Sequence, residues 1–181
     1  MEFSVRTVRE EDAESIAEIL KPIIQAGRYT IMDEQLSMDD QLDFIRGFPK
    51  RGVFNVAVWN ESQKIVGIQD VAPISTGSNA FKHVGEISTF VSLDLQRQGI
   101  GRRLSQATFR EASAQGFLKI CATVRADNPQ AVSFYLSQGF RIIGTAHKHA
   151  LVKGKYVDEI FMEKLLDLAS SAQEEGRVAV S

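Results

Sequence analysis

The chain has 181 residues, of which 44% are hydrophobic and 24% are charged. This length and composition suit a protein that buries about two thirds of its unfolded surface. The formal net charge of -2 gives no global electrostatic reason to bind nucleic acid, so any basic site must be local.

The amino-terminal part of the chain predicts one strand and two helices. Residues 3–9, FSVRTVR, alternate apolar and polar positions as a half-buried strand does, and an acidic cluster then opens a helix. Pro22 should kink or restart this helix, because proline removes one intrahelical hydrogen bond and crowds the preceding turn. Ser37 and Asp40 form a capping pair, which predicts the start of a second, shorter helix.

The middle of the chain predicts a hairpin, a further strand and a helix. Residues 53–74 read as two strands joined by the polar turn at residues 60–63, which indicates an antiparallel region. After a polar stretch, residues 83–93, HVGEISTFVSL, have the pattern of another strand. Residues 99–115 then have a helical pattern, which Gly116 ends as a C-cap glycine commonly does.

The next strand completes a crossover unit. Residues 118–124, LKICATV, alternate strictly, and a strand, a helix and a strand in this order place the two strands parallel. Asn128 is a typical N-cap, and together with Pro129 it starts another helix, which Gly139 ends. The last two strands are expected from about residue 140 to 152 and from 155 to 164.

These elements predict a mixed α/β fold whose sheet is antiparallel early and parallel around the central crossover. No repeat and no linker rich in proline, glycine or serine divides the chain, so we expect a single domain over residues 1–166. Residues 167–181 contain no aromatic residue, and we expect them to form a short helix or a loosely held tail.

Signals for export and for metal binding are weak in this sequence. The segment MEFSVRTVREED lacks the apolar core of a signal peptide, and no apolar run approaches the ~20 residues that span a bilayer. Cys121 is the only cysteine, and the three histidines are poorly spaced for a metal site. We therefore expect a cytoplasmic protein with no metal, no membrane partner and no nucleic-acid partner.

The stretch LQRQGIGRRL, residues 95–104, places two glycines among three arginines between a strand and a helix. A tight turn there leaves the first N–H groups of the helix unpaired, and the helix dipole adds positive charge, so the turn attracts anions. Gly99 and Gly101 let the backbone approach a bulky ligand, and the arginines supply cations for phosphates. The alternative is a plain strand-to-helix turn whose arginines face solvent.

The segment QRQGIG, residues 96–101, resembles the Gln/Arg-x-x-Gly-x-Gly/Ala signature of the GNAT superfamily of acyl-CoA-dependent N-acetyltransferases. The later segment ADNPQAVSFYLSQGF is similar to that family's next helix, and the order of elements matches over about residues 3–165. The ending GKYVDEIFMEK resembles the branch of phosphinothricin and related amino-acid acetyltransferases. The resemblance implies a three-layer fold whose central, mostly antiparallel sheet is split by one parallel strand pair.

The resemblance also implies that acetyl-CoA lies in the split between these two strands. It assigns the pantetheine and acetyl contacts to Thr89, Phe90 and Val91, and the diphosphate contacts to Arg97, Gln98, Gly99, Ile100, Gly101 and Arg102. Asn128 matches a family asparagine that reaches the cofactor. The alternative is an N-cap that bonds its own helix, and both roles are compatible if different amide atoms serve them.

Catalytic roles follow from the same resemblance. Tyr135 matches the family tyrosine near the cofactor sulfur, where a phenol can donate a proton to the departing thiolate; the alternative is a core aromatic. A backbone N–H near Phe90 is the expected oxyanion donor. Glu86 matches a glutamate that takes the amine proton through water. Its alternatives are a plain strand-end carboxylate and loss of the proton to solvent without a dedicated base.

In this family, the loop of residues 27–33 and the last hairpin cover the side of the site where the acceptor binds. Four residues of this chain are expected there. Tyr29 and Thr30 are expected to shape the pocket, and Arg28 to pair with a substrate carboxylate. Asp158 is expected to orient a neighbour or to support a dimer contact. The alternative for each is a polar loop residue that serves solubility.

We therefore expect an acetyl-CoA-dependent N-acetyltransferase acting on a small primary amine, an amino acid or an analogue, by direct attack in a ternary complex. One alternative is acetylation of a protein amino terminus or a lysine. Another is a non-catalytic acyl-CoA-binding module, which would need neither Tyr135 nor Glu86. The family also implies a homodimer.

Overall fold

The computed structural model describes residues 2–166, so the tail expected at residues 167–181 lies outside the described residues. The strands are β1 (Phe3–Thr7), β2 (Val53–Trp59), β3 (Ile65–Pro73), β4 (Val84–Val91), β5 (Lys119–Arg125), β6 (Arg141–Val152) and β7 (Lys155–Leu165). The α-helices are α1 (Ala13–Ala26), α2 (Met38–Gly47), α3 (Ile100–Ala114) and α4 (Pro129–Ser137). No helix among these residues is long and apolar enough to cross a membrane.

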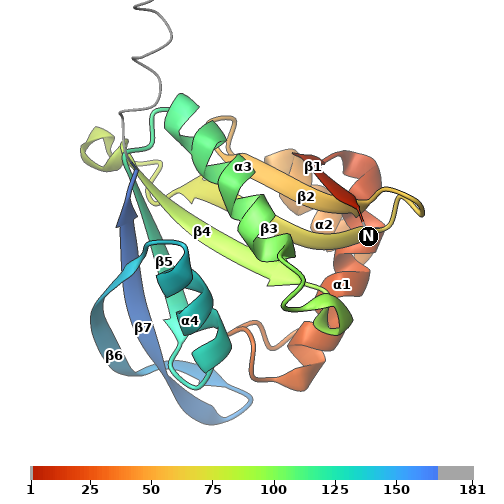
Figure 1. Cartoon of the computed structure of the whole chain (residues 1–181). Helices are drawn as coiled ribbons and strands as arrows, with labels where there is room; N and C mark the ends of the chain where they lie inside the picture. Colours follow the sequence, from red (N-terminus) through yellow and green to blue (C-terminus); the bar gives the residue numbers. More distant parts are fainter. Residues whose placement is uncertain (1, 167–181) are drawn as a thin grey trace, which may run out of the picture.

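The strands form one sheet in the order β1-β2-β3-β4-β5-β7-β6, with helices on both faces (Figure 1). α3 and α4 lie on one face, and α1 and α2 lie on the other. Side-chain alternation in β3 shows the same division, because Gln69 bonds Ser105 of α3 whereas Ile68 packs with the apolar stripe of α1. The result is the predicted α/β fold in three layers.

Neighbouring strands pair antiparallel except for β4 and β5, which are parallel. This confirms the predicted fold class, and the reason is that α3 carries the chain across from one strand to the other. The predicted hairpin of β2 and β3 is also confirmed, with a register shift between Ala57 and Val58.

β4 and β5 pair only at their beginning. The paired residues of β4 run from Val84 to Glu86, and no further pair with β5 follows in the described part of the chain. β3 continues to pair with β4 as far as Val91, and β7 pairs with β5 as far as Arg125. The two half-sheets therefore separate beyond Glu86, and one edge of β4 is left without a strand partner.

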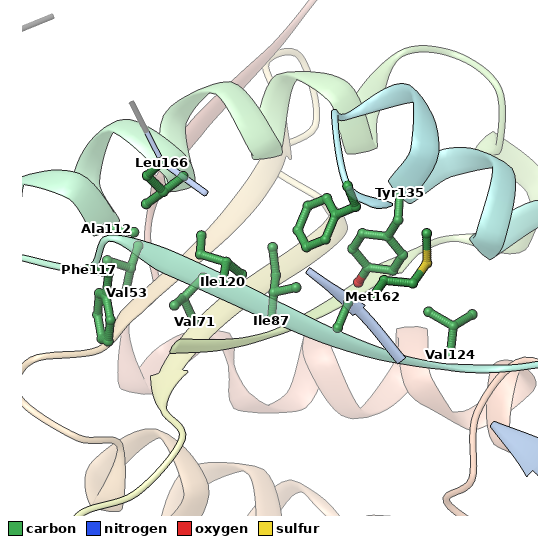
Figure 2. Packing of buried hydrophobic residues seen from close by; sticks show 12 residues of the cluster. Val53, Val71, Ile87, Ala112, Phe117, Ile120, Val124, Tyr135, Met162 and Leu166 are labelled. Atoms are coloured by element: carbon green, nitrogen blue, oxygen red, sulfur yellow. The ribbon is translucent and has the colours of Figure 1, made fainter. Parts of the chain in front are cut away.

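A buried apolar cluster beneath α3 and α4 joins the two half-sheets (Figure 2). Val71 and Ile87 belong to one half, Ile120 and Met162 belong to the other, and Phe117 is fully buried among them. Because few main-chain hydrogen bonds join β4 to β5, this cluster has to hold the halves together.

α1 runs without a restart through Pro22, so the alternative of a restarted helix is wrong. Proline leaves the carbonyl of Glu18 without its helical partner, but both residues lie on the exposed face, where water can bond that carbonyl. The predicted cap of α2 is confirmed. The Asp40 N–H donates to Ser37 Oγ at 3.1 Å, and the Ser37 N–H donates to the Asp40 carboxylate at 2.8 Å.

Phe117→Ala should lower the free energy of unfolding by about 3–5 kcal/mol, because it opens a cavity in the cluster that joins the half-sheets. Urea unfolding followed by circular dichroism measures the loss. Phe81→Ala is the matched control, because Phe81 is 51% exposed and its truncation should change stability by at most ~0.5 kcal/mol. Equal losses in the two variants would contradict the role given to Phe117.

Candidate active site

A cleft of about 640 Å³ opens where β4 and β5 separate. Its walls come from the end of β4, the turn before α3, the first turn of α3, and α4. The predicted site residues that line it are Tyr29, Thr89, Phe90, Val91, Arg97, Gly99, Ile100, Gly101, Arg102, Asn128 and Tyr135. The predicted residues outside its lining are Arg28, Thr30, Glu86, Gln98 and Asp158.

The β4 edge that faces the cleft offers main-chain groups at alternate residues. Ser92 donates its N–H to the Val66 carbonyl, so Phe90 likewise directs its main-chain groups to β3. Thr89 and Val91 direct theirs to the cleft, where an extended ligand can pair as an added strand does. The oxyanion donor expected near Phe90 is therefore better matched by the N–H of Thr89 or Val91.

The turn before α3 leaves the start of the helix open to the cleft. Gly99 is the N-cap of α3 and has a φ of 81°, a left-handed conformation that favours glycine. No side chain caps α3 in the described residues, and nothing lies within 4 Å of where a Cβ at Gly99 would stand. The first N–H groups of the helix therefore remain available, and Arg97 and Arg102 line the same part of the cleft.

Gly101 and Arg103 make contacts in the structure other than those expected from the sequence. A Cβ at Gly101 would lie 2.9 Å from the Phe134 ring, so this glycine is required for the packing of α3 against α4. Arg103, expected to supply a cation for phosphates, places its guanidinium 5.2 Å from the centre of the Phe3 ring and is not in the cleft lining. Two of the three arginines of this stretch, Arg97 and Arg102, therefore line the cleft.

Tyr135 is buried where α4 meets the end of β4. Its O–H donates to Thr89 Oγ1 at 3.1 Å, and Gln69 Nε2 donates to the same oxygen at 2.9 Å. Burial is the main cause that raises the pKa of the Tyr135 phenol; the hydrogen bond with Thr89 lowers it, and the charges of Asp70 and Glu86 raise it. The phenol therefore stays protonated at neutral pH and can act as a donor at the cleft wall.

Asn128 uses both atoms of its side-chain amide. Its Oδ1 accepts a hydrogen bond of 3.2 Å from the Ala131 N–H, which caps α4, and its Nδ2 donates to the Tyr29 carbonyl at 3.5 Å. The predicted N-cap is confirmed. Asn128 also lines the cleft, so it joins α4 to the loop between α1 and α2 at the cleft wall.

Two carboxyl groups lie beside the opening on the face of the sheet opposite α3. Glu86 is exposed, and it accepts a hydrogen bond of 3.2 Å from the Thr123 hydroxyl of β5. Asp70 on β3 is 8% exposed, and burial followed by the charge of Glu86 raises its pKa to about 7. Asp70 is not among the residues predicted from the sequence, although a carboxylate inside the run IVGIQDVA is a recognisable signal.

Comparison with known proteins decides the family. Residues 5–161 match the family model described as an acetyltransferase (GNAT) domain. The chain belongs to the GNAT acetyltransferase family.

Two named relatives and one solved structure are similar to the chain over different lengths. The L-amino acid N-acyltransferase MnaT of Escherichia coli (strain K12) is 24% identical over 165 residues, which cover 91% of this chain and 95% of that protein. The L-methionine sulfoximine/L-methionine sulfone acetyltransferase of Pseudomonas paraeruginosa is 30% identical over 92 residues, 51% of this chain and 54% of that one. A GNAT superfamily phosphinothricin acetyltransferase from Sinorhizobium meliloti, solved in complex with AcCoA, has the same fold: its TM-score is 0.83 at 21% identity, covering 92% of this chain and 89% of that one.

The loop between α1 and α2 of this GNAT chain places its predicted acceptor residues differently. Tyr29 lines the cleft, and Arg28 donates to its hydroxyl at 2.6 Å. Thr30 is buried: its Oγ1 accepts from the Met32 N–H at 3.2 Å, and its carbonyl accepts from Arg125 Nη1 at 3.0 Å. The Thr30 carbonyl therefore holds the loop to β5, and the Thr30 hydroxyl forms a hydrogen bond within the loop. Arg125, which makes this link, is not among the residues predicted from the sequence.

Asp158 lies on β7, outside the lining of the cleft. Its Oδ1 accepts from the Lys148 N–H at 2.7 Å, and its Oδ2 lies 2.9 Å from His147 Nδ1. Both partners belong to the irregular part of β6 between Ala146 and Ala150, so Asp158 orients that segment. Within residues 2–166, no group of three or more His, Cys, Asp or Glu side chains is arranged to hold a metal ion.

Gly101→Ala should lower the free energy of unfolding by about 1 kcal/mol or more, because the new methyl overpacks against the Phe134 ring and this cost exceeds the gain in helix propensity. The loss should be smaller in a Phe134→Leu background, which makes room. Urea unfolding of the single and double variants measures this coupling.

Gly99→Ala is the matched comparison, because it strains a left-handed position without a clash. It should cost about 1–2 kcal/mol in both the wild-type and the Phe134→Leu background. If the losses from Gly101→Ala and Phe134→Leu are strictly additive, the packing role of Gly101 is wrong.

Proposed function

We propose that this chain is an acetyl-CoA-dependent N-acetyltransferase that acetylates a primary amine of a small molecule, an amino acid or an analogue, by direct attack in a ternary complex. The observation that carries the proposal is the cleft at the opening between β4 and β5, where an uncapped helix start and a protonated phenol lie beside an unpaired strand edge. Family membership supports the reaction type, and the acyltransferases among the relatives support the acceptor class.

The residues of the cleft fit acetyl-CoA in chemical terms. The N–H groups at the start of α3, with Arg97 and Arg102, suit a diphosphate. The unpaired edge at Thr89 and Val91 suits the amide groups of pantetheine. Gln98 belongs to the same turn and is proposed to contact the diphosphate with it. Bound acetyl-CoA supplies the acetyl group as an activated thioester.

Tyr135 is proposed to protonate the leaving sulfur. Its pKa is raised by burial, so it holds its proton at neutral pH, and its O–H already reaches Thr89 on the cleft edge of β4. A donor at this position neutralises a departing thiolate. The N–H of Thr89 or Val91 donates to the thioester carbonyl as negative charge develops there.

The acceptor is proposed to approach from the face of the sheet opposite α3. Glu86 is exposed on that face, and the Thr123 hydroxyl orients its carboxylate, which attracts a protonated amine. Arg28 lies in the loop beside the cleft and suits a substrate carboxylate, while Tyr29 forms the adjoining wall. This pairing of charges favours amino acids over polyamines, because only amino acids bring a carboxylate.

We also propose that residues 1–166 form one domain, that the enzyme is cytoplasmic, and that it acts as a homodimer without a nucleic-acid or membrane partner. Exposed apolar side chains on β6 and β7 support the dimer, because a second copy can cover them. They include Leu151, Tyr156 and Leu165. The net charge of -2 supports the lack of a nucleic-acid partner.

Incubation of the purified protein with acetyl-CoA and separate acceptors should release free thiol with amino acids or their analogues. The acceptor panel includes amino acids, polyamines and peptides with free amino termini or lysines, and a thiol reagent measures the release. Faster turnover of peptides than of amino acids would favour the protein acetyltransferase instead. Tight binding of acetyl-CoA without turnover of any amine would contradict the proposed enzyme.

Tyr135→Phe should lower kcat by about 10²-fold with little change in the dissociation constant of acetyl-CoA. The expected factor lies at the low end for general acid catalysis, because a thiolate is a good leaving group. Steady-state kinetics and calorimetric titration measure the two quantities. Ser62→Ala, which removes a hydroxyl in the exposed turn between β2 and β3 and away from the cleft, is the control and should leave kcat unchanged. An unchanged kcat in Tyr135→Phe would rule out the donor role.

A further inference from the structure

Asp70 is a buried carboxyl group next to the point where the sheet opens. It stands opposite Ser88 in the pairing of β3 with β4, and Ser88 lies just beyond the last residue of β4 that pairs with β5. Its neighbour Gln69 points to α3, so strand alternation places Asp70 on the opposite face, the proposed acceptor face. Asp70 therefore lies beside the opening, one strand away from the cleft edge at Thr89.

The surroundings of Asp70 leave its carboxyl without a hydrogen-bond partner. The residue is 8% exposed, and among residues 2–166 no hydrogen bond to its carboxyl oxygens is present. Across the strand pair, β2 places Phe54 opposite Asp70, and α1 covers this face with apolar side chains. An unpartnered polar group in such a place is costly unless a ligand or water completes it.

Among residues 2–166, the ionisable groups that interact with Asp70 come from two elements. Glu86 of β4 shares its face and is diagonal to it, because Glu86 stands opposite Ala72. Tyr135 of α4 is the other, and its own pKa is raised in part by Asp70. Burial and the charge of Glu86 raise the pKa of Asp70 to about 7, which is near the value that suits a general base at neutral pH.

We propose that Asp70 is the group that takes the proton from the ammonium of the acceptor, an inference that rests on the proposed acetyl transfer. An N–H bond of the ammonium breaks, an O–H bond forms on the Asp70 carboxylate, and the amine is left neutral. The amine nitrogen then bonds to the acetyl carbon and the C–S bond breaks. Tyr135 gives its proton to the sulfur and recovers one from the nitrogen, and Asp70 releases its proton to solvent.

Glu86 has a different part in this scheme. Its exposed carboxylate attracts the ammonium and, as a like charge close to Asp70, keeps that carboxyl a stronger base. Replacing the two residues therefore gives different results. Loss of Asp70 removes the base, whereas loss of Glu86 leaves a weaker base in place.

The pH dependence of kcat/KM for the acceptor tests this assignment. A base has to be deprotonated to act, so the wild-type value should fall as the pH drops through about 7. Asp70→Asn should remove this limb and lower the plateau by about 10²- to 10⁴-fold. Glu86→Gln should keep the limb and move it to lower pH. A limb that survives Asp70→Asn and disappears in Glu86→Gln would overturn the proposal.

A second acceptor separates loss of the base from general damage to the site. A hydrazide analogue of the acceptor is already neutral at the assay pH, so Asp70→Asn should acetylate it at close to the wild-type rate. Failure of this rescue in a variant that still binds acetyl-CoA would also overturn the proposal. If the wild type acetylates no acceptor at any pH, the proposed function itself fails.

Infrared difference spectroscopy tests the carboxyl without any substrate. The protonated carboxyl band that Asp70→Asn removes should titrate near pH 7 in the wild type. Titration near pH 4, the ordinary range of an aspartate, would contradict the role given to Asp70. This measurement holds even if the variant folds poorly, because the titrated protein is the wild type.

Discussion

The short parallel pairing of β4 with β5 is the constraint on which the rest of the structure depends. Beyond Glu86 each strand keeps only its outer partner, so the main-chain groups of Thr89 and Val91 have to be satisfied by water or by a ligand. The main-chain bonds lost at the opening are offset by apolar burial elsewhere. Phe117 and its neighbours join the halves on the α3 side, which allows the backbone to part without separating the sheet into two domains.

Hydrogen bonds among polar side chains of β3, β4, α3 and α4 hold the cleft wall in position. Gln69 bonds both Thr89 and Ser105, and these bonds are directional in a way that apolar packing is not. Ser105 lies about one turn after Gly101, so its bond to β3 sets the rotation of α3 and with it the direction of the first N–H groups. The same Thr89 hydroxyl accepts from Tyr135. One network therefore orients both the Tyr135 phenol, the proposed donor to the sulfur, and the start of α3, the proposed diphosphate site.

The parts of the fold that the sequence predicted are those with local causes. The Ser37 cap and the Asn128 cap each depend on a few consecutive residues, and the crossover follows from the order of the elements. What the sequence could not supply depends on distant neighbours. Gly101 is required because Phe134 lies against it, and Thr30 is held by Arg125 from a strand far along the chain. Periodicity carries no information about such contacts.

The strand β4 separates two sites of opposite charge. On the α3 side, Arg97, Arg102 and the uncapped helix start suit the anionic part of acetyl-CoA. On the other side, Asp70 and Glu86 suit a cationic amine. The net charge of -2 does not reveal these two sites, because the positive charges of one largely offset the negative charges of the other. In the proposed reaction each substrate is drawn to its own face, and the opening beyond Glu86 is where the amine and the thioester can meet.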